Sequence, residues 1–182
     1  AKEKFSYLTP LTDKLAIFEQ MGFDQVLVVD LATDIGKLSP QLFVEHFMLD
    51  LTVTDVVDGF DFTYGDRQVA NMTNLADYAH HKFTVHEISP QVVQGKKSSS
   101  TWIRSALADH DLMTVNLLLG RSFQIKGQVI HGRQVGRKLG FPTANIQPLT
   151  QQRLPALGIY ATRLQIGSTW WPSMTSVGRN VT

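Results

Sequence analysis

The charge balance of this chain changes sign along its length, and this change limits the ways in which the chain can fold. Up to Asp111, nine Lys and Arg residues stand against all 16 acidic residues, a balance of −7. After Asp111, eight Lys and Arg residues stand against none, a balance of +8. The spacing of apolar residues changes at nearly the same place, from helical spacing to an alternation of period two. We therefore expect two domains, of which the second binds anions.

Residues 1–120 are expected to form an α/β domain of Rossmann type, because helical patterns alternate with short apolar runs. The expected strands cover residues 25–30, 56–57 and 83–88. The expected helices run from Pro10 to Gly22, from Pro40 to Met48, from Asn71 to His81 and from Asp109 to Gly120. Residues 25–30 read Gln-Val-Leu-Val-Val-Asp, a continuous apolar run that is typical of a buried parallel strand.

Residues 121–182 are expected to form a small antiparallel β-barrel. Their alternation predicts strands over residues 123–130, 158–166 and 169–177, and a turn at Gly167-Ser168 joins the last two. No helical pattern follows residue 120. The predicted domain boundary therefore lies at Gly120-Arg121.

The composition narrows the cellular setting of the protein. The chain has no cysteine, which excludes disulfides and thiolate metal sites and favours the reducing cytoplasm. No apolar run approaches membrane-spanning length, so we expect no membrane partner. The first residues, Ala1-Lys-Glu-Lys, are neither an initiator Met nor a signal peptide, and we expect the chain to begin inside a longer protein.

Residues 131–145 carry the most specific pattern, His-Gly-Arg-Gln-Val-Gly-Arg-Lys-Leu-Gly-Phe-Pro-Thr-Ala-Asn. Three glycines stand four residues apart with cationic side chains between them, and both features suit a bound phosphate. Pro142 favours an extended segment, in which Thr143 and Asn145 face the same side and offer two neutral oxygens to Mg²⁺. On residue types alone, a solvated loop between strands explains the pattern equally well.

Two further motifs lie in the first domain. Gly59-Phe-Asp-Phe-Thr-Tyr-Gly65 follows an expected strand, where exposed aromatic rings can stack on a flat ligand. Packing of these rings into the core is the simpler alternative. Lys96-Lys-Ser-Ser-Ser-Thr-Trp-Ile-Arg104 lies at the start of an expected helix, where amides, hydroxyls and a guanidinium can meet a phosphate. An ordinary Ser or Thr N-cap is the simpler alternative there.

These motifs resemble one enzyme family, the bacterial bifunctional riboflavin kinase/FMN adenylyltransferase, or FAD synthetase. Gly127-Gln-Val-Ile-His-Gly132 and then Gly136-Arg-Lys-Leu-Gly-Phe-Pro-Thr-Ala-Asn145 closely resemble the riboflavin kinase signature. The aromatic motif followed by Ser-Ser-Thr-x-Ile-Arg is similar to the adenylyltransferase half. The resemblance extends from about Leu8 to Thr182. The family's His-x-Gly-His motif is absent from this sequence, and the family's barrel continues beyond the residues present here.

The resemblance implies roles for three groups of residues. ATP and its phosphates in the kinase would meet Gly132, Gly136, Arg137, Lys138, Gly140, Phe141, Pro142, Thr143 and Asn145. Thr143 and Asn145 would also hold Mg²⁺. In the adenylyltransferase, ATP would meet Ser99, Ser100, Thr101 and Arg104, and the flavin would meet Asp61, Phe62 and Tyr64. The kinase base would be a Glu beyond Thr182.

The expected function is flavin cofactor synthesis, by ATP-dependent phosphorylation of riboflavin to FMN and adenylylation of FMN to FAD. The expected partners are ATP with Mg²⁺ and riboflavin or FMN, and not nucleic acid, because the basic charges are spread rather than run together. Three alternatives stay open: a kinase whose first domain is structural only, a protein that holds flavin or nucleotide without turnover, and a basic β-domain that binds single-stranded nucleic acid.

Overall fold

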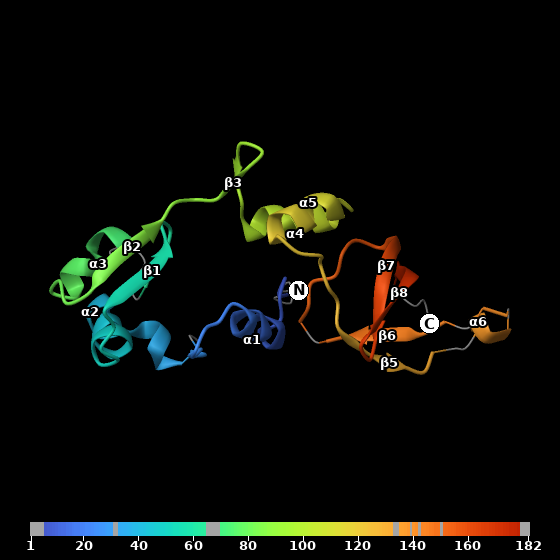
Figure 1. The fold of residues 1–182 in the computed structure, drawn as a ribbon, viewed down its shortest axis with the longest axis horizontal. Helices are drawn as coiled ribbons and strands as arrows, with labels where there is room; N and C mark the ends of the chain where they lie inside the picture. Colours follow the sequence, from blue (N-terminus) through green and yellow to red (C-terminus); the bar gives the residue numbers. More distant parts are fainter. Residues whose placement is uncertain are drawn as a thin grey trace. The chain divides into compact units, whose positions relative to one another are not determined.

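The computed structural model describes residues 6–30, 33–64, 70–132, 135–138, 140–141, 143–149 and 151–178. The chain divides into two compact units (Figure 1). We call Asp24–Ser98 the middle unit, and Ala1–Phe23 together with Ser99–Thr182 the terminal unit. The domain boundary expected near Gly120 falls inside the terminal unit. That this boundary separates the two expected activities stays a prediction.

A strand–helix–strand element forms the centre of the middle unit. Strands β1 (Asp55–Gly59) and β2 (Thr84–Ile88) are parallel, and their register pairs the first residue of one with the first of the other. Parallel neighbours need a crossover, and helix α3 (Met72–Tyr78) lies in the segment that supplies it. These elements confirm the two strands and the helix expected in this part of the sequence.

Short helical segments and a hairpin complete the middle unit. They are the 3₁₀ turn η1 (Asp34–Lys37), helix α2 (Pro40–Val44), the π-helical turn η2 (Glu45–Leu49), and strands β3 (Val92–Val93) and β4 (Lys96–Lys97). Helix α2 starts as expected, because Ser39 Oγ accepts a hydrogen bond from the Leu42 amide at 3.3 Å. Asn71 caps α3 in the same way and accepts from the Thr73 amide at 3.0 Å.

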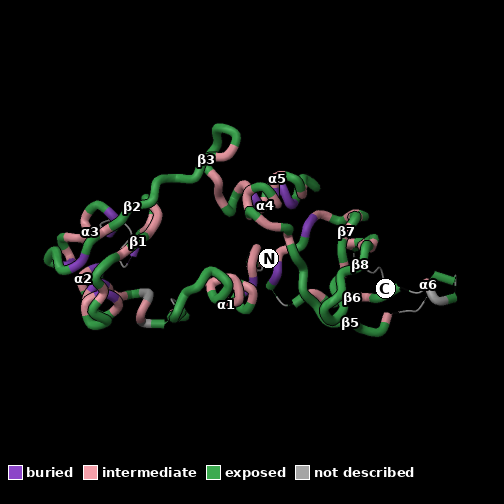
Figure 2. The backbone as a smooth tube through the Cα atoms, viewed as in Figure 1, coloured by how far each residue is buried: buried purple, intermediate pink, exposed green. Residues whose placement is uncertain are grey.

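The core of the middle unit gathers side chains from α2, α3 and the adjoining segments. Its buried members are Val44, Met48, Tyr64, Ala70, Met72, Leu75, Ala79 and Phe83 (purple in Figure 2). Val56 and Val85, one from each strand, pack against this cluster. Removal of these apolar groups from water is the main force that holds α3 against the two strands.

Residues 25–30 do not form the buried strand that the sequence predicts, and the Rossmann-type layer is therefore reduced to one strand–helix–strand element. Val26, Leu27 and Val28 are 41, 67 and 55% exposed. An apolar run becomes a buried parallel strand only where neighbouring strands satisfy its amides and helices cover its faces. Among the described residues, β1 and β2 pair only with each other.

In the described part of the terminal unit, the longer helices are α1 (Leu11–Gln20), α4 (Ser100–Ala108) and α5 (Leu112–Leu119). Helices α1 and α5 confirm the helices expected there. Gly120 ends α5 at φ +64°, a backbone conformation that favours glycine. Helices α4 and α5 share a small core of Ile103, Ala106, Leu107 and Val115.

The strands of the terminal unit form two separate hairpin sheets and not the closed barrel that the sequence predicts. Strands β7 (Gly158–Ile166) and β8 (Thr169–Val177) match the expected hairpin, with φ +61° at Gly167 in its turn. Strand β5 (Gly127–Ile130) pairs with β6 (Asn145–Pro148), a strand that the sequence analysis does not predict. A barrel needs every strand to pair on both sides, and in the described chain the two hairpins do not pair with each other.

Helix α6 (Val135–Lys138) contradicts the expectation of no helix after residue 120. A single turn of four residues is too short to show a helical period in the sequence. No helix in the described ranges is both long and apolar enough to cross a membrane.

Candidate functional site

The β5–β6 ladder holds the two ends of the glycine-rich loop together. The register pairs Ile130, the last residue of β5, with Asn145, the first residue of β6. The residues that begin and end this loop therefore lie at the same end of the sheet (Figure 1). An antiparallel stem of this kind fixes the spacing of the residues at its mouth. Gly132 on one side and Asn145 on the other become neighbours.

Two glycines of this loop lie against the two residues expected to bind magnesium. A Cβ atom at Gly132 would overlap the side-chain amide of Asn145. A Cβ atom at Gly136 would overlap the carbonyl oxygen of Phe141 and would lie 3.2 Å from Thr143 Oγ1. Glycine permits these close approaches because it has no side chain. The structure thus brings four residues of the predicted site together as two pairs, Gly132 with Asn145 and Gly136 with Thr143.

Lys138, Gly140 and Phe141, which are also predicted in this loop, are exposed, as is Thr143. The Phe141 amide donates to the Gly136 carbonyl oxygen at 2.8 Å, while the Phe141 side chain is 78% exposed. Lys138 is exposed, and Gly140 turns the chain at φ +82°. Pro142 and the side chain of Arg137 lie outside the described residues.

The donor groups at the loop suit a cation that is bound together with phosphate. Thr143 offers a hydroxyl oxygen and Asn145 an amide oxygen, and both are neutral. Within the described ranges no group of three or more His, Cys, Asp or Glu side chains could hold a metal ion. Mg²⁺ commonly takes few ligands from the protein and the rest from water and substrate phosphates. The residues present therefore fit Mg²⁺ bound with a nucleotide.

The aromatic motif starts at the end of β1 in the middle unit. A turn closes there, because the Phe62 amide donates to the Gly59 carbonyl oxygen at 2.9 Å. The carboxylate of Asp61 pairs with Lys97 Nζ at 2.7 Å, and this hydrogen bond lowers the pKa of Asp61 below its usual value. Lys97 Nζ also lies 4.3 Å from the ring centre of Phe60, within the range of a cation–π contact.

Lys97 belongs to the motif over residues 96–104, and its pairing with Asp61 is not predicted from the sequence. It lies in β4, 36 residues after Asp61, and the β3–β4 hairpin positions it. The pair Lys96-Lys97, directly before the Ser and Thr run, is the sequence feature that could have indicated a cation here.

Tyr64, one of the residues expected on the flavin side, belongs to the core. It is 3% exposed, and its ring centre lies 5.9 Å from that of Phe43, 5.7 Å from Phe62 and 6.2 Å from Tyr78. Its hydroxyl donates to Asn74 Oδ1 at 3.2 Å, and burial raises the pKa of Tyr64 to about 12. Phe62 is half-buried. A role of these aromatic residues in flavin binding stays a prediction.

The Ser and Thr run lies at the start of α4 in the terminal unit. Ser99 Oγ accepts a hydrogen bond from the Trp102 amide at 3.2 Å, so Ser99 caps the helix. Ser100 and Thr101 are exposed in the first turn, and Arg104 one turn later is half-buried. Because this run and the aromatic motif belong to different units, a site that they share stays a prediction.

Two family models match this chain. The FAD synthetase model matches residues 1–102, and the riboflavin kinase model matches residues 119–182. The aromatic motif lies within the first match, and the glycine-rich loop lies within the second.

Curated relatives cover almost all of this chain. A Listeria monocytogenes protein named bifunctional riboflavin kinase/FMN adenylyltransferase is 40% identical over 181 residues, which are 100% of this chain and 58% of that protein. Proteins of the same name from Bacillus subtilis and Escherichia coli K12 are 36 and 34% identical, over 97 and 96% of this chain and 56% of each relative. The chain thus spans a little more than half the length of these relatives.

One solved structure is similar over nearly the whole chain. It is a crystal structure described as a macrolide-efflux protein from Streptococcus pneumoniae, with a TM-score of 0.87 and 28% sequence identity. The match covers 96% of this chain and 57% of the other.

Proposed function

The chain belongs to the FAD synthetase family, and from this membership we propose that it binds ATP and flavins for the synthesis of FMN and FAD. The observation that supports the kinase part best is the packing of Gly132 on Asn145 and of Gly136 on Thr143. Both pairs lie within the residues that the riboflavin kinase model matches. A backbone that carries no side chains at these two positions can also come close to a phosphate, which supports the proposal.

In the proposed kinase reaction, the terminal ribityl hydroxyl of riboflavin attacks the γ-phosphorus of ATP. A bond forms between this oxygen and phosphorus, the bond to the β-phosphate oxygen breaks, ADP leaves, and the hydroxyl proton passes to a base. Backbone amides near Gly132 and Gly136 would approach the phosphate oxygens, and Lys138 would add positive charge. Thr143 and Asn145 would hold Mg²⁺, which neutralises charge on the phosphates.

In the proposed adenylyl transfer, a phosphate oxygen of FMN attacks the α-phosphorus of ATP, and pyrophosphate leaves. We assign the flavin side to Asp61, Phe62 and Tyr64, with Tyr64 supporting the ring of Phe62 from the core. We assign the ATP side to Ser99, Ser100, Thr101 and Arg104. Arg104 suits this role because a guanidinium can hold two phosphate oxygens at once.

We also propose that the protein acts in the cytoplasm on ATP and riboflavin or FMN, and not on nucleic acid. The absence of cysteine fits a reducing compartment. The relatives' names, which refer to flavins and not to nucleic acid, support the choice of ligand.

Replacement of Asn145 tests the kinase site. Asn145→Ala should weaken the affinity for Mg·ADP by about tenfold or more, because a polar contact to a charged ligand is lost. Its affinity for riboflavin should change less than about twofold. Calorimetry measures the affinity for Mg·ADP, and flavin fluorescence measures the affinity for riboflavin. Gln147→Ala, an exposed position on the same strand, is the matched control. Unchanged Mg·ADP affinity in Asn145→Ala would refute the assignment.

A further inference from the structure

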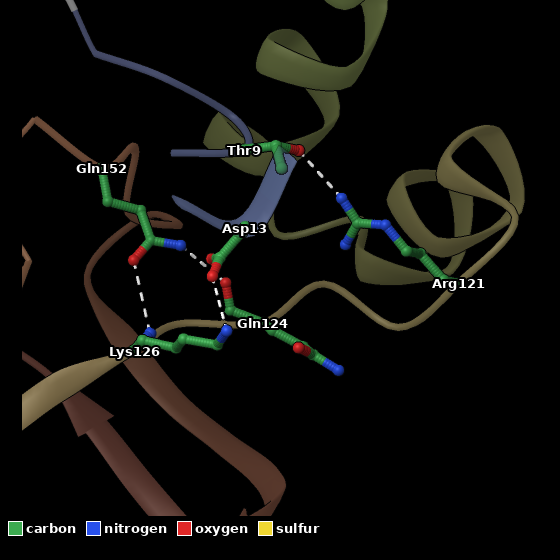
Figure 3. Close-up of polar contacts among 6 residues, drawn as sticks. All are labelled: Thr9, Asp13, Arg121, Gln124, Lys126 and Gln152. Atoms are coloured by element: carbon green, nitrogen blue, oxygen red, sulfur yellow. Dashed lines mark hydrogen bonds and ion pairs between the residues drawn. The ribbon is translucent and has the colours of Figure 1, made fainter. Parts of the chain in front are cut away.

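The base of the β5–β6 stem is fastened by contacts that centre on Lys126, the residue before β5. The Lys126 amide donates to Gln152 Oε1 at 3.4 Å, and its carbonyl oxygen accepts from the Leu149 amide at 3.0 Å. Its ammonium group pairs with Asp13 Oδ1 at 2.5 Å (Figure 3). Gln152 Nε2 in turn donates to the carbonyl oxygen of Gln124 at 2.7 Å. Both the backbone and the side chain of Lys126 are therefore held.

Gln152 holds the segment before β5 through two side-chain hydrogen bonds. It is 8% exposed, and its side-chain oxygen and nitrogen both have partners. A buried amide that loses such a partner is left with an unpaired polar group, which is costly. The segment before β5 is therefore held in place, and Asp13 adds a contact from a distant part of the sequence.

Asp13 joins the two regions that the family models match separately. It lies in the first turn of α1, 113 residues before Lys126, and its side chain is 13% exposed. Residue 13 falls in the FAD synthetase match and residue 126 in the riboflavin kinase match. A second contact runs parallel to this one, because Arg121 Nη2 donates to Thr9 Oγ1 at 2.8 Å (Figure 3).

The other end of the same stem carries the glycine-rich loop. Strand β5 spans the four residues between Lys126 and His131, about 13 Å of extended chain. A Cβ atom at Gly127 would overlap the carbonyl oxygen of Gln147, so the two strands are closely fitted near the base as well as at the loop. A one-residue change of register would turn every side chain of the strand to the other face. Contacts that hold Lys126 therefore also help to hold the mouth of the loop, where Gly132 lies against Asn145.

We propose that Asp13 is a positioning residue for nucleotide binding, which acts by pairing with Lys126 and fixing the stem of the glycine-rich loop. This inference rests on the proposed function, which assigns a nucleotide to that loop. A helix in the region matched by the FAD synthetase model thereby sets the nucleotide affinity of the region matched by the riboflavin kinase model.

Titration of the 182-residue chain with Mg·ADP tests the inference. Asp13→Asn and Lys126→Met should each weaken the affinity about two- to fivefold, as expected for an ion pair that is partly exposed. A cavity of about 160 Å³, lined in part by Thr9 and Gln124, adjoins the pair and can admit water, which keeps the effect moderate. The double variant should bind no more weakly than the weaker single variant, because both substitutions remove one contact.

Two controls separate positioning from a general loss of stability. Glu19→Gln removes one negative charge from the same helix and should bind Mg·ADP like the wild type. The exchanged pair, Asp13→Lys with Lys126→Asp, should recover the wild-type affinity to within about twofold. Without nucleotide, the amides of β5 should exchange hydrogen faster in Asp13→Asn than in Glu19→Gln.

The inference is wrong if folded Asp13→Asn binds Mg·ADP as tightly as the wild type, or if the losses of the two single variants add in the double variant. If Asp13→Asn does not fold, Lys126→Met carries the same test, because its side chain is 55% exposed. A wild-type chain that binds no Mg·ADP would overturn the proposed nucleotide site and this inference with it. In that case, faster hydrogen exchange of the β5 amides in Asp13→Asn than in Glu19→Gln would still show whether Asp13 stabilises the stem.

Discussion

The side-chain amide of Asn145 lies so close to Gly132 that a Cβ atom at residue 132 would overlap it. The atoms in the way belong to a side chain that can rotate, so an alanine there should displace Asn145 and spare the backbone. At Gly136 the nearest atom is the carbonyl oxygen of Phe141, which is backbone. The two glycines therefore offer a way to separate an effect on the ligand site from an effect on the fold.

Gly132→Ala should lower the affinity for Mg·ADP by about tenfold while the free energy of unfolding changes by less than about 1 kcal/mol. Gly136→Ala should instead destabilise the protein by about 1–3 kcal/mol, because the loop backbone must move. Calorimetry and urea unfolding on both variants measure these effects. If Gly132→Ala binds Mg·ADP like the wild type, the orientation of Asn145 does not matter for binding.

Arg104→Ala should weaken the binding of pyrophosphate, the product of adenylyl transfer, by about tenfold and leave riboflavin binding unchanged. The reason is that Arg104 is assigned to the ATP phosphates of that reaction alone. Arg163→Ala, which removes the same charge from an exposed position in β7, is the control. Equal weakening in both variants would show a general effect of charge, and a lower unfolding midpoint in Arg104→Ala alone would show a role in packing.

The stability of the middle unit should fall in alkaline solution because of Tyr64. Its pKa is about 12 in the folded protein against an ordinary value of 10.0. Below pH 10 both the folded and the unfolded chain keep the proton. Between pH 10 and about 12 the unfolded chain loses it first, so this residue lowers stability by up to about 1.4 kcal/mol per pH unit.

Tyr64→Phe removes this part of the pH dependence. At neutral pH the variant should lose about 1 kcal/mol of stability, because the hydrogen bond to Asn74 is gone. Above pH 10 its unfolding midpoint in urea should fall less steeply than that of the wild type. Parallel curves for the two proteins would contradict the assignment of this titration to Tyr64.

The chain by itself should phosphorylate riboflavin poorly. After Asp111 it contains no Asp or Glu, and His131 is the one histidine there. A positioned base contributes about 10²- to 10⁴-fold, so we expect less than about one-hundredth of the rate of the Listeria monocytogenes relative in an assay with labelled ATP. A comparable rate would point to His131 as the base, and His131→Gln should then abolish it.

Features set by local chemistry could be predicted from the sequence. Ser39 and Asn71 cap helices where their residue types indicate, and the β7–β8 hairpin turns at Gly167 as its pattern predicts. The contacts of Gly132 and Gly136 follow the same logic, because three spaced glycines indicate close approaches whose partners the sequence pattern alone does not identify.

Features that depend on distant partners could not be predicted in the same way. Residues 25–30 have the composition of a buried strand, but composition does not supply neighbouring strands. Strands β5 and β6 pair across the 14 residues between Ile130 and Asn145. Because these strands are short and far apart in the sequence, the alternation of apolar residues does not indicate that they pair. Tyr64 and Phe62 look alike in the sequence, and only packing distinguishes the core residue from the half-buried one.

The distance along the chain between Asp13 and Lys126 has a consequence for biosynthesis. At about 5–20 residues per second, a ribosome needs roughly 6 to 23 seconds to add the 113 residues that separate them. Helix α1 is thus synthesised well before Lys126, with which it pairs. The middle unit, Asp24–Ser98, is synthesised completely before α4. The middle unit can therefore fold first during synthesis. Helix α1 can form its contact with Lys126 only later, after the stem of the glycine-rich loop has been synthesised.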